Sequence, residues 1–172
     1  SIVLAEEALD IAHKSQNESL ISYALFNAGN AYFYQGMYET ATVYFYQYLD
    51  IQKQLESQSG IAYALANIGA IRIKMQDFEM AKQSFLEGLH ILEALSPEDS
   101  LGLIKQQIPN IINNLGIVYQ NLQQFDSALW YYREGIHLSA FVEDQKYFQA
   151  SIYNNIGGLF LDNNMPDSAF VP

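Results

Sequence analysis

The chain has 172 residues, 50 % hydrophobic and 16 % charged, which is enough for a domain with a substantial core and too apolar for disorder. Its net charge of −11 and its eight scattered Lys and Arg residues argue against a nucleic-acid partner, since binding to phosphates requires clustered basic side chains. The absence of cysteine excludes disulfides, thiolate metal sites and cysteine nucleophiles.

Apolar residues at three- or four-residue spacing predict helices along most of the chain. A first helix covers residues 2–15, and helical pairs follow it. The pairs are predicted at 19–35 with 38–56, at 60–75 with 78–95, and at 109–122 with 125–142. In the second pair, Asp77 stands directly before Phe78 and predicts a helix start there. A last helix is predicted over 145–163, and Pro166 opens one more.

The segment between the second and third pairs is longer than its counterparts. It contains Ser96, Pro97, Glu98 and Asp99, a helix-start pattern with a capping serine, a proline in the first turn and acids after it. We therefore predict an added helical segment, with a plain loop insertion as the alternative. Pro109 is expected to kink or break this helix before the third pair resumes.

A short phrase, x-Asn-apolar-Gly, recurs four times along the chain. Its glycines are Gly29, Gly69, Gly116 and Gly157, separated by 40, 47 and 41 residues, and an alanine follows each glycine twelve residues later, as Ala41, Ala81, Ala128 and Ala169. A period in this range is typical of stacked repeats. Because small side chains let two helices pack closely, we expect Gly29 to meet Ala41, and Gly69 and Gly116 to meet Ala81 and Ala128 in the same way.

The repeat divides the chain into a single array. We expect a partial repeat at 1–17, complete repeats at 18–58, 59–95 and 109–143, an inserted segment at 96–108, and a partial repeat at 144–172. No apolar run approaches the roughly 20 residues of a membrane helix, and no signal peptide opens the chain. Since Ser1 is not a methionine and the pattern stops soon after Pro166, we expect a piece of a longer protein.

No motif for catalysis or for metal binding is found. His13, His90 and His137 fall on the second helices of pairs, without the HxxxH spacing of a metal site. No pattern gathers Ser, His and Asp into a triad, and no phosphate-binding loop is present. We expect a non-enzymatic protein without a cofactor or a metal.

Four asparagines share one place in the repeat: Asn27, Asn67, Asn114 and Asn155. Asparagine is a mediocre residue inside a helix, so four in register need a reason. An amide offers both a donor and an acceptor and can hold the N–H and C=O of an extended peptide. The candidate peptide-binding set adds residues on the same face: Tyr23, Asn30, Tyr34, Tyr63, Lys74, Asn113, Asn121 and Asn154. The alternative is that the asparagines bridge adjacent helices.

Two other departures from the repeat are informative. Arg72 stands where other repeats have Tyr32, Tyr119 and Phe160, so its charge must extend to solvent or find a carboxylate. The aromatic run from Tyr44 to Tyr48 is expected to pack mostly between repeats.

These residues resemble the tetratricopeptide repeat family. The matching positions are Leu25, Ala28, Gly29, Tyr32, Gly36, Tyr38, Ala41 and Phe45 in the first copy, Leu65, Ile68, Gly69, Phe78, Ala81, Phe85 and Gly88 in the second, and Ile112, Leu115, Gly116, Tyr119, Phe125, Ala128, Tyr132 and Gly135 in the third. The period is similar to that of the long-helix variety, with repeats of about 40 residues.

The resemblance implies an all-α fold, a right-handed α-α superhelix of helical hairpins whose concave groove holds a peptide or protein segment. In long-helix relatives, asparagines at this site hold peptide backbones. Chaperone-binding members grip a carboxylate with basic residues, but this chain has Phe26, Ala66 and Asn113 there, so that activity is not expected.

The functional hypothesis is a peptide-binding scaffold, the sensing or docking module of a larger bacterial signalling protein such as a sensor kinase or a transcription regulator. No nucleic acid and no direct membrane insertion are expected. A cytoplasmic location is favoured, or a periplasmic one if the chain is attached to a membrane sensor. The alternatives are a structural spacer that oligomerises through exposed repeat ends, and a regulatory domain that binds a small metabolite.

Overall fold

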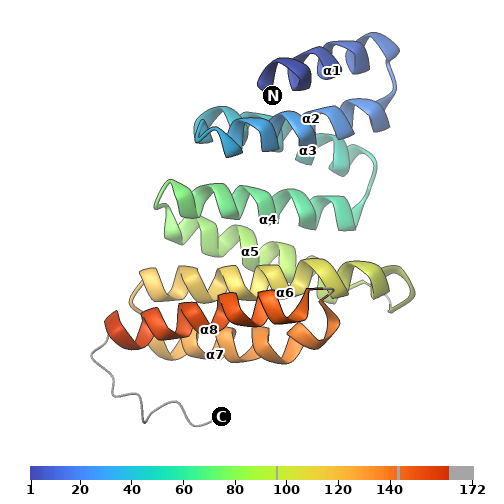
Figure 1. Cartoon of the computed structure of the whole chain (residues 1–172). Coiled ribbons are helices and arrows are strands. Elements are labelled where there is room, and N and C mark those ends of the chain that lie inside the picture. The colour runs from blue at the N-terminus through green and yellow to red at the C-terminus, as the bar shows by residue number, and fades with distance from the viewer. Residues whose placement is uncertain (96, 143, 163–172) are drawn as a thin grey trace. The chain divides into compact units, whose positions relative to one another are not determined.

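The computed structural model describes the backbone of residues 1–95, 97–142 and 144–162, and their side chains except those of 97–106, 141 and 162. All regular structure in these ranges is helical (Figure 1). The elements are α1 (Ile2–Ser15), α2 (Glu18–Tyr34), α3 (Tyr38–Gln54), α4 (Gln58–Lys74), α5 (Phe78–Glu93), α6 (Pro97–Asn121), α7 (Phe125–Leu138), the short 3-10 helix η1 (Ser139–Phe141) and α8 (Gln145–Asp162). They form two compact units, residues 1–95 and residues 96–172. The helix predicted to open at Pro166 lies outside the described residues.

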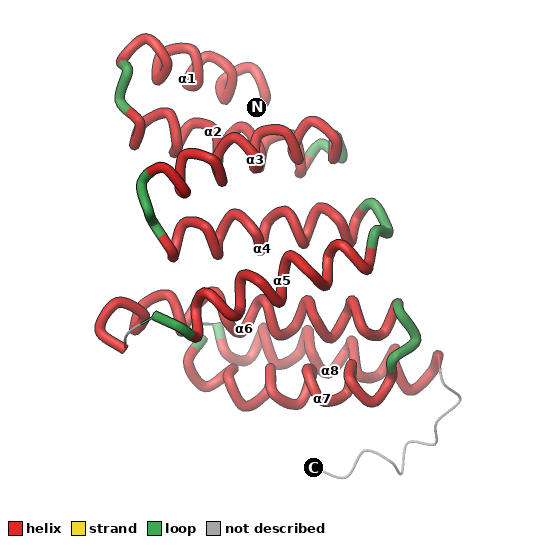
Figure 2. The backbone as a smooth tube through the Cα atoms, turned by 180° about the vertical axis from the view of Figure 1, so that it is seen from behind, coloured by secondary structure: helices red, strands yellow, loops and turns green. Residues whose placement is uncertain are grey.

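Consecutive helices within each unit are joined by short loops (Figure 2) and pack against each other. Side chains cap several of the helix starts. Asn17 and Ser57 accept hydrogen bonds from the backbone N–H groups of Leu20 and Gly60, and the predicted cap at Asp77 is confirmed by its bond from the N–H of Met80. These side chains satisfy backbone donors that the first turn of a helix leaves without partners.

The loop inside each hairpin repeats one backbone conformation. Gly36, Gln76 and Gln123 take left-handed φ angles of 76°, 61° and 57° between the two helices of their hairpins. The same conformation at equivalent positions gives the three hairpins the same turn.

An aromatic ring of the second helix lies against the glycine of each complete repeat, and the alanine expected to meet that glycine precedes the ring by one turn. A Cβ added to Gly29 would lie 2.8 Å from the ring of Phe45, and one added to Gly69 would lie 2.8 Å from the ring of Phe85. At Gly116 the ring is that of Tyr132, at 2.4 Å. Each ring comes four residues after the alanine, one helical turn along the same face. The alanines are fully buried and allow the close approach, while the ring occupies the glycine's space.

The inserted segment is helical from Pro97 and continues without a break into the first helix of the third hairpin. The expectation that Pro109 would break the helix is therefore wrong, since α6 runs through it. Proline removes one hydrogen bond, the one to the carbonyl of residue 105, and a helix of 25 residues keeps its other bonds on either side.

A carboxylate and two phenols fasten α1 to the first hairpin. The hydroxyl groups of Tyr32 and Tyr44 both donate to Oε1 of Glu6, at 2.8 and 2.6 Å, and the two rings stack with centroids 5.3 Å apart. Burial, followed by the bond to Glu6, raises the pKa of Tyr44, and the bond to Glu6 is the main cause that raises the pKa of Tyr32. Three helices are thus tied by one carboxylate oxygen.

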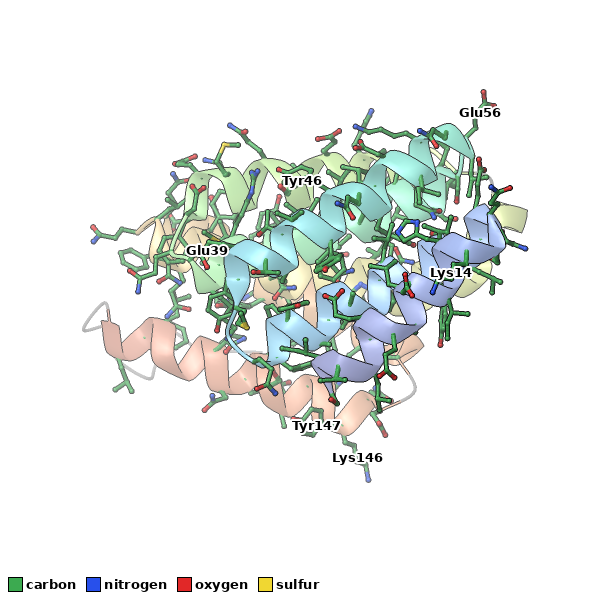
Figure 3. The ribbon with its side chains drawn as sticks, turned by 90° about the horizontal axis from the view of Figure 1, so that it is seen from above. Lys14, Glu39, Tyr46, Glu56, Lys146 and Tyr147 are labelled. Carbon is green, nitrogen blue, oxygen red and sulfur yellow. The ribbon has the colours of Figure 1, made fainter. Side chains whose placement is uncertain are left out.

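The next junction uses different chemistry at the equivalent place. Arg72 takes the position of Tyr32, and its guanidinium donates to the hydroxyl of Tyr46 at 2.6 Å and to the carbonyl of Met80 at 3.0 Å. Figure 3 shows Tyr46 on α3. Arg72 was expected to extend to solvent or to find a carboxylate. It finds no carboxylate, and its guanidinium binds two neutral oxygens through hydrogen bonds that are exposed, as the first alternative predicts.

We expect the stability of the chain to fall at alkaline pH through Tyr44. A group whose folded pKa is raised stabilises the fold below its unfolded pKa, which is 10.0 for tyrosine, and loses this contribution as the pH rises through its folded pKa. Tyr44→Phe should lower the free energy of unfolding at pH 7 by about 1 kcal/mol, and should reduce its decline above pH 10. Urea unfolding at pH 7, 9, 10 and 11 measures both effects. Equal declines in Tyr44→Phe and the parent would contradict the assignment, and Tyr34→Phe, at an exposed ring, is the control.

Candidate functional site

In unit 1 the predicted peptide-binding residues form matching rows on the first helices of two neighbouring hairpins. On α2 the row has spacings of four, three and four residues, and α4 repeats it forty residues later. The rows are Tyr23, Asn27, Asn30 and Tyr34 on α2, and Tyr63, Asn67, Ala70 and Lys74 on α4. The tyrosines of α2 and Lys74 are exposed, and the remaining residues are half-buried. A ring contact of 5.2 Å between Phe26 and Tyr63 joins the two helices.

A pocket of about 430 Å³ lies at this junction, between α2, α3 and α4. Its walls are largely aromatic, and Phe26 is at their centre. The ring centroid of Phe26 lies 5.8 Å from that of Tyr48 and 5.2 Å from that of Tyr63. Tyr23, which is 69 % exposed, lines the same pocket. The complete lining is Ser19, Ser22, Tyr23, Phe26, Tyr48, Gln52, Leu55 and Tyr63.

Two buried polar side chains line this aromatic pocket. Gln52 and Ser22 are 8 % and 5 % exposed, and the Gln52 amide donates to the Ser22 hydroxyl at 2.6 Å. The Gln52 side chain passes over Gly60, where an added Cβ would lie 1.8 Å from Gln52 Oε1. Glycine at position 60 therefore makes the room that brings this amide to the pocket.

The phenols of Tyr48 and Tyr63 are electrically neutral at physiological pH. Burial raises the pKa of Tyr48, and burial is also the largest cause that raises the pKa of Tyr63. Both hydroxyls therefore keep their protons and can donate or accept hydrogen bonds.

The four repeated asparagines have different surroundings. Asn67 donates to the carbonyl of Tyr63, one turn back on its own helix, at 2.8 Å. In unit 2, Asn155 on α8 donates to Oδ1 of Asn113 on α6 at 3.2 Å, and so bridges two helices. The side-chain amides of Asn27 and Asn114 form no hydrogen bond with any residue that the structure describes. The other two predicted residues of unit 2 are exposed: Asn121, which donates to the carbonyl of Ile117, and Asn154.

Other kinds of site find no support in the described ranges. Within 1–95, 97–142 and 144–162, no three His, Asp or Glu side chains are grouped so that they could hold a metal ion. His13, His90 and His137 are all exposed. None of the helices in these ranges combines the length and the hydropathy needed to span a bilayer.

Sequence reasoning missed the buried polar pair, although a signal was present. The residues forty positions after Gln52 and Ser22 are Leu92 and Ala62, both apolar and fully buried. Comparing the copies position by position would have shown a glutamine and a serine at core positions. It would also have shown Phe26 and Tyr48 where the next copy has Ala66 and Gly88.

The fold and its repeated hairpins define a helical repeat protein of the kind that serves as a protein-interaction scaffold. The chain belongs to the tetratricopeptide repeat family. Two family profiles, each described as a tetratricopeptide repeat, match residues 22–55 and 62–91 in one case and 110–139 in the other. A comparison with curated protein sequences finds no significant match.

Solved structures with the same fold are numerous. BtubC (BKLC) from P. vanneervenii aligns with a TM-score of 0.77 at 19 % identity, over 95 % of this chain and 65 % of that one. The apo form of RapI aligns with a TM-score of 0.76 at 21 % identity, over 93 % and 60 % of the two chains. The nearly identical TPR-like repeats assigned to a kinesin light chain of Podosopora anserina align with a TM-score of 0.71 at 14 % identity, over 98 % and 79 %.

These similarities establish the fold, a solenoid of helical repeats, and at such low identity they establish the fold alone. The chain spans less than two thirds of the length of BtubC and of RapI.

Proposed function

We propose that this chain binds an extended peptide or protein segment along the face that α2 and α4 present. The observation that carries the proposal is the aromatic pocket between these helices, next to the row that contains Asn27 and Asn67. Amides beside an aromatic pocket suit a peptide, because an amide can hold the peptide backbone while the pocket takes a side chain.

We propose that unit 2 carries a corresponding set of peptide-binding residues of its own on α6 and α8. Asn114 has a full amide available, and Asn121 and Asn154 are exposed. Asn113 and Asn155 are engaged with each other, but each amide keeps a further donor or acceptor that a peptide backbone can use.

We further propose that the chain serves as the sensing or docking module of a longer bacterial signalling protein, such as a sensor kinase or a transcription regulator. The support is the period of about 40 residues, which is similar to that of repeats found in such proteins. This part of the proposal rests on the repeat type and not on a site.

The structural alternative, a spacer that oligomerises, is favoured by exposed apolar residues on α1. Leu4 and Ile11 lie seven residues apart on one face of the helix and are 66 % and 67 % exposed. This structural alternative predicts that the chain self-associates through the side chains of Leu4 and Ile11. The metabolite-binding alternative would use a pocket at the insertion, residues 96–107, and the side chains of 97–106 lie outside those that the structure describes.

The test is a peptide-array screen of the whole chain beside the variant Asn27→Ala/Asn67→Ala. Losing the hydrogen bonds of two amides should weaken the binding of selected peptides about tenfold, while the melting curve stays unchanged. Gln83→Ala, which removes an exposed amide from the second helix α5, is the matched control and should bind as the parent does. Equal binding by the double variant and the parent, or no binding of any peptide, would refute the proposal.

A further inference from the structure

The side chains that line the aromatic pocket between α2, α3 and α4 carry no charge. Four of the lining residues are aromatic, one is leucine, and the polar ones are two serines and a glutamine. Aromatic rings attract cations through the negative potential of their faces. The raised pKa values of Tyr48 and Tyr63 keep these two phenols neutral, so their attraction for a cation does not depend on ionisation.

The pocket also offers an accessible hydrogen-bond acceptor. The amide nitrogen of Gln52 is engaged by Ser22 at 2.6 Å, while Gln52 Oε1 has no hydrogen-bond partner among the described residues. Gln52 as a residue is 92 % buried, but solvent reaches its Oε1, so this oxygen can accept a hydrogen bond from a ligand that brings a donor.

Packing does not require this polar pair. In the following hairpin the equivalent positions hold Leu92 and Ala62, and both side chains are fully buried. The same fold is therefore built with apolar residues where Gln52 and Ser22 stand. The Gln52–Ser22 pair is therefore specific to this pocket, and the fold of the repeat does not require polar side chains at these positions.

The charge around the pocket favours a cation as well. The chain carries a net charge of −11, and no Lys, Arg or His lines the pocket. Two carboxylates are next in sequence to lining residues, Glu18 beside Ser19 and Glu56 beside Leu55, while Lys53 follows Gln52. Glu18, Glu56 and Lys53 are all exposed, so the sequence neighbours of the lining residues carry two negative charges and one positive charge.

From these observations we infer that the pocket binds the cationic side chain of an arginine or a lysine in the partner segment. The aromatic rings hold the charged group and the oxygen of Gln52 accepts a hydrogen bond from it. The inference rests on the proposed function and specifies the residue that a bound peptide presents to unit 1.

The first test uses blocked tripeptides as probes and the whole chain with labelled leucine methyl groups. N-acetyl-Gly-Arg-Gly amide should shift the NMR signals of Leu55, which lines the pocket, and should saturate at a lower concentration than the Gly-Leu-Gly and Gly-Phe-Gly probes. N-acetyl-Gly-Glu-Gly amide should leave Leu55 unchanged. Tighter binding of an apolar or acidic probe, or no shift of Leu55 by the arginine probe at its solubility limit, would overturn the inference.

Variants locate the effect in the pocket. Tyr23→Leu removes an exposed ring and should weaken the arginine probe at least about threefold. The double variant Gln52→Leu/Ser22→Ala installs the residues of the next hairpin, should stay folded, and should abolish the preference for arginine over leucine. Tyr147→Leu is the control, since Tyr147 is 81 % exposed and projects from the start of α8 (Figure 3). Retained preference in the double variant would contradict the role of Gln52.

The two proposals fail in different ways. If selected peptides lose binding in Asn27→Ala/Asn67→Ala but contain no excess of arginine or lysine, the proposed function stands and the inference falls. If the arginine probe binds through Tyr23 and Gln52 while no longer peptide is held, the inference stands and peptide binding along the helices falls.

Discussion

Replacing Phe85 with alanine is expected to lower the free energy of unfolding by about 3 to 5 kcal/mol, because a fully buried ring would leave a cavity. Leu86→Ala, at the next position of the same helix, removes a side chain that is 37 % exposed and should cost less than about 1 kcal/mol. Denaturant unfolding of both variants measures the difference. Equal costs would show that the ring of Phe85 is not a core residue.

The stronger form of this prediction is a coupling between Phe85 and Gly69. In the parent, Gly69→Ala places a Cβ 2.8 Å from the ring and should cost about 1 to 3 kcal/mol through overpacking. In the Phe85→Ala background the ring is gone, so the same change should be neutral or gain about 0.5 to 1 kcal/mol of helix stability. The expected coupling energy is about 2 kcal/mol. A cost of Gly69→Ala that is the same in both backgrounds would refute the contact.

The helices could be predicted from the sequence because their evidence is local. Apolar periodicity and caps such as Asp77 depend on residues within a few turns of one another. The predicted helices at 2–15 and 78–95 correspond to α1 and to α5, with ends that differ by no more than two residues.

The contacts between the helices were harder to predict, since they depend on how long the side chains are and in which direction they point across a hairpin. The spacing of Gly69 and Ala81 correctly indicated a close approach, but the ring of Phe85, one turn further on, fills the space. Of the two effects expected of Pro109, the break does not occur and the kink stays a prediction. A proline removes one bond at a known place, but whether the helix continues depends on the bonds and packing on either side of it.

The candidate site could be predicted only in part, because it too depends on contacts between side chains of different helices. The row of Tyr23 and Asn27 on α2, and the matching row that begins at Tyr63 on α4, follow from helical geometry. The Gln52–Ser22 pair joins residues thirty positions apart on different helices, and no local pattern links them. The fate of each asparagine also depends on the neighbouring helix, since Asn155 meets Asn113 while Asn27 meets no described partner.

The two glycines that the repeated phrase places in unit 2, Gly116 and Gly157, should respond to the same substitution with opposite signs. Gly116→Ala places a Cβ 2.4 Å from the ring of Tyr132, which is fully buried and held by a hydrogen bond of 2.8 Å from its hydroxyl to Gln120. Because the ring cannot move aside without losing that bond, we expect a loss of about 2 to 3 kcal/mol. At Gly157 an added Cβ meets no described atom within 4 Å, so Gly157→Ala should gain about 0.5 to 1 kcal/mol.

Thermal melting distinguishes the two outcomes, since 1 kcal/mol corresponds to about 2 to 4 °C in a chain of this size. Gly116→Ala should melt below the parent and Gly157→Ala slightly above it. Both glycines belong to the same repeated phrase, so the sequence alone predicts equal effects for them. Opposite signs would show that the demand for glycine comes from the ring across the hairpin. A lower melting temperature at both positions would show instead that another side chain packs against Gly157 on α8, as the ring of Tyr132 packs against Gly116.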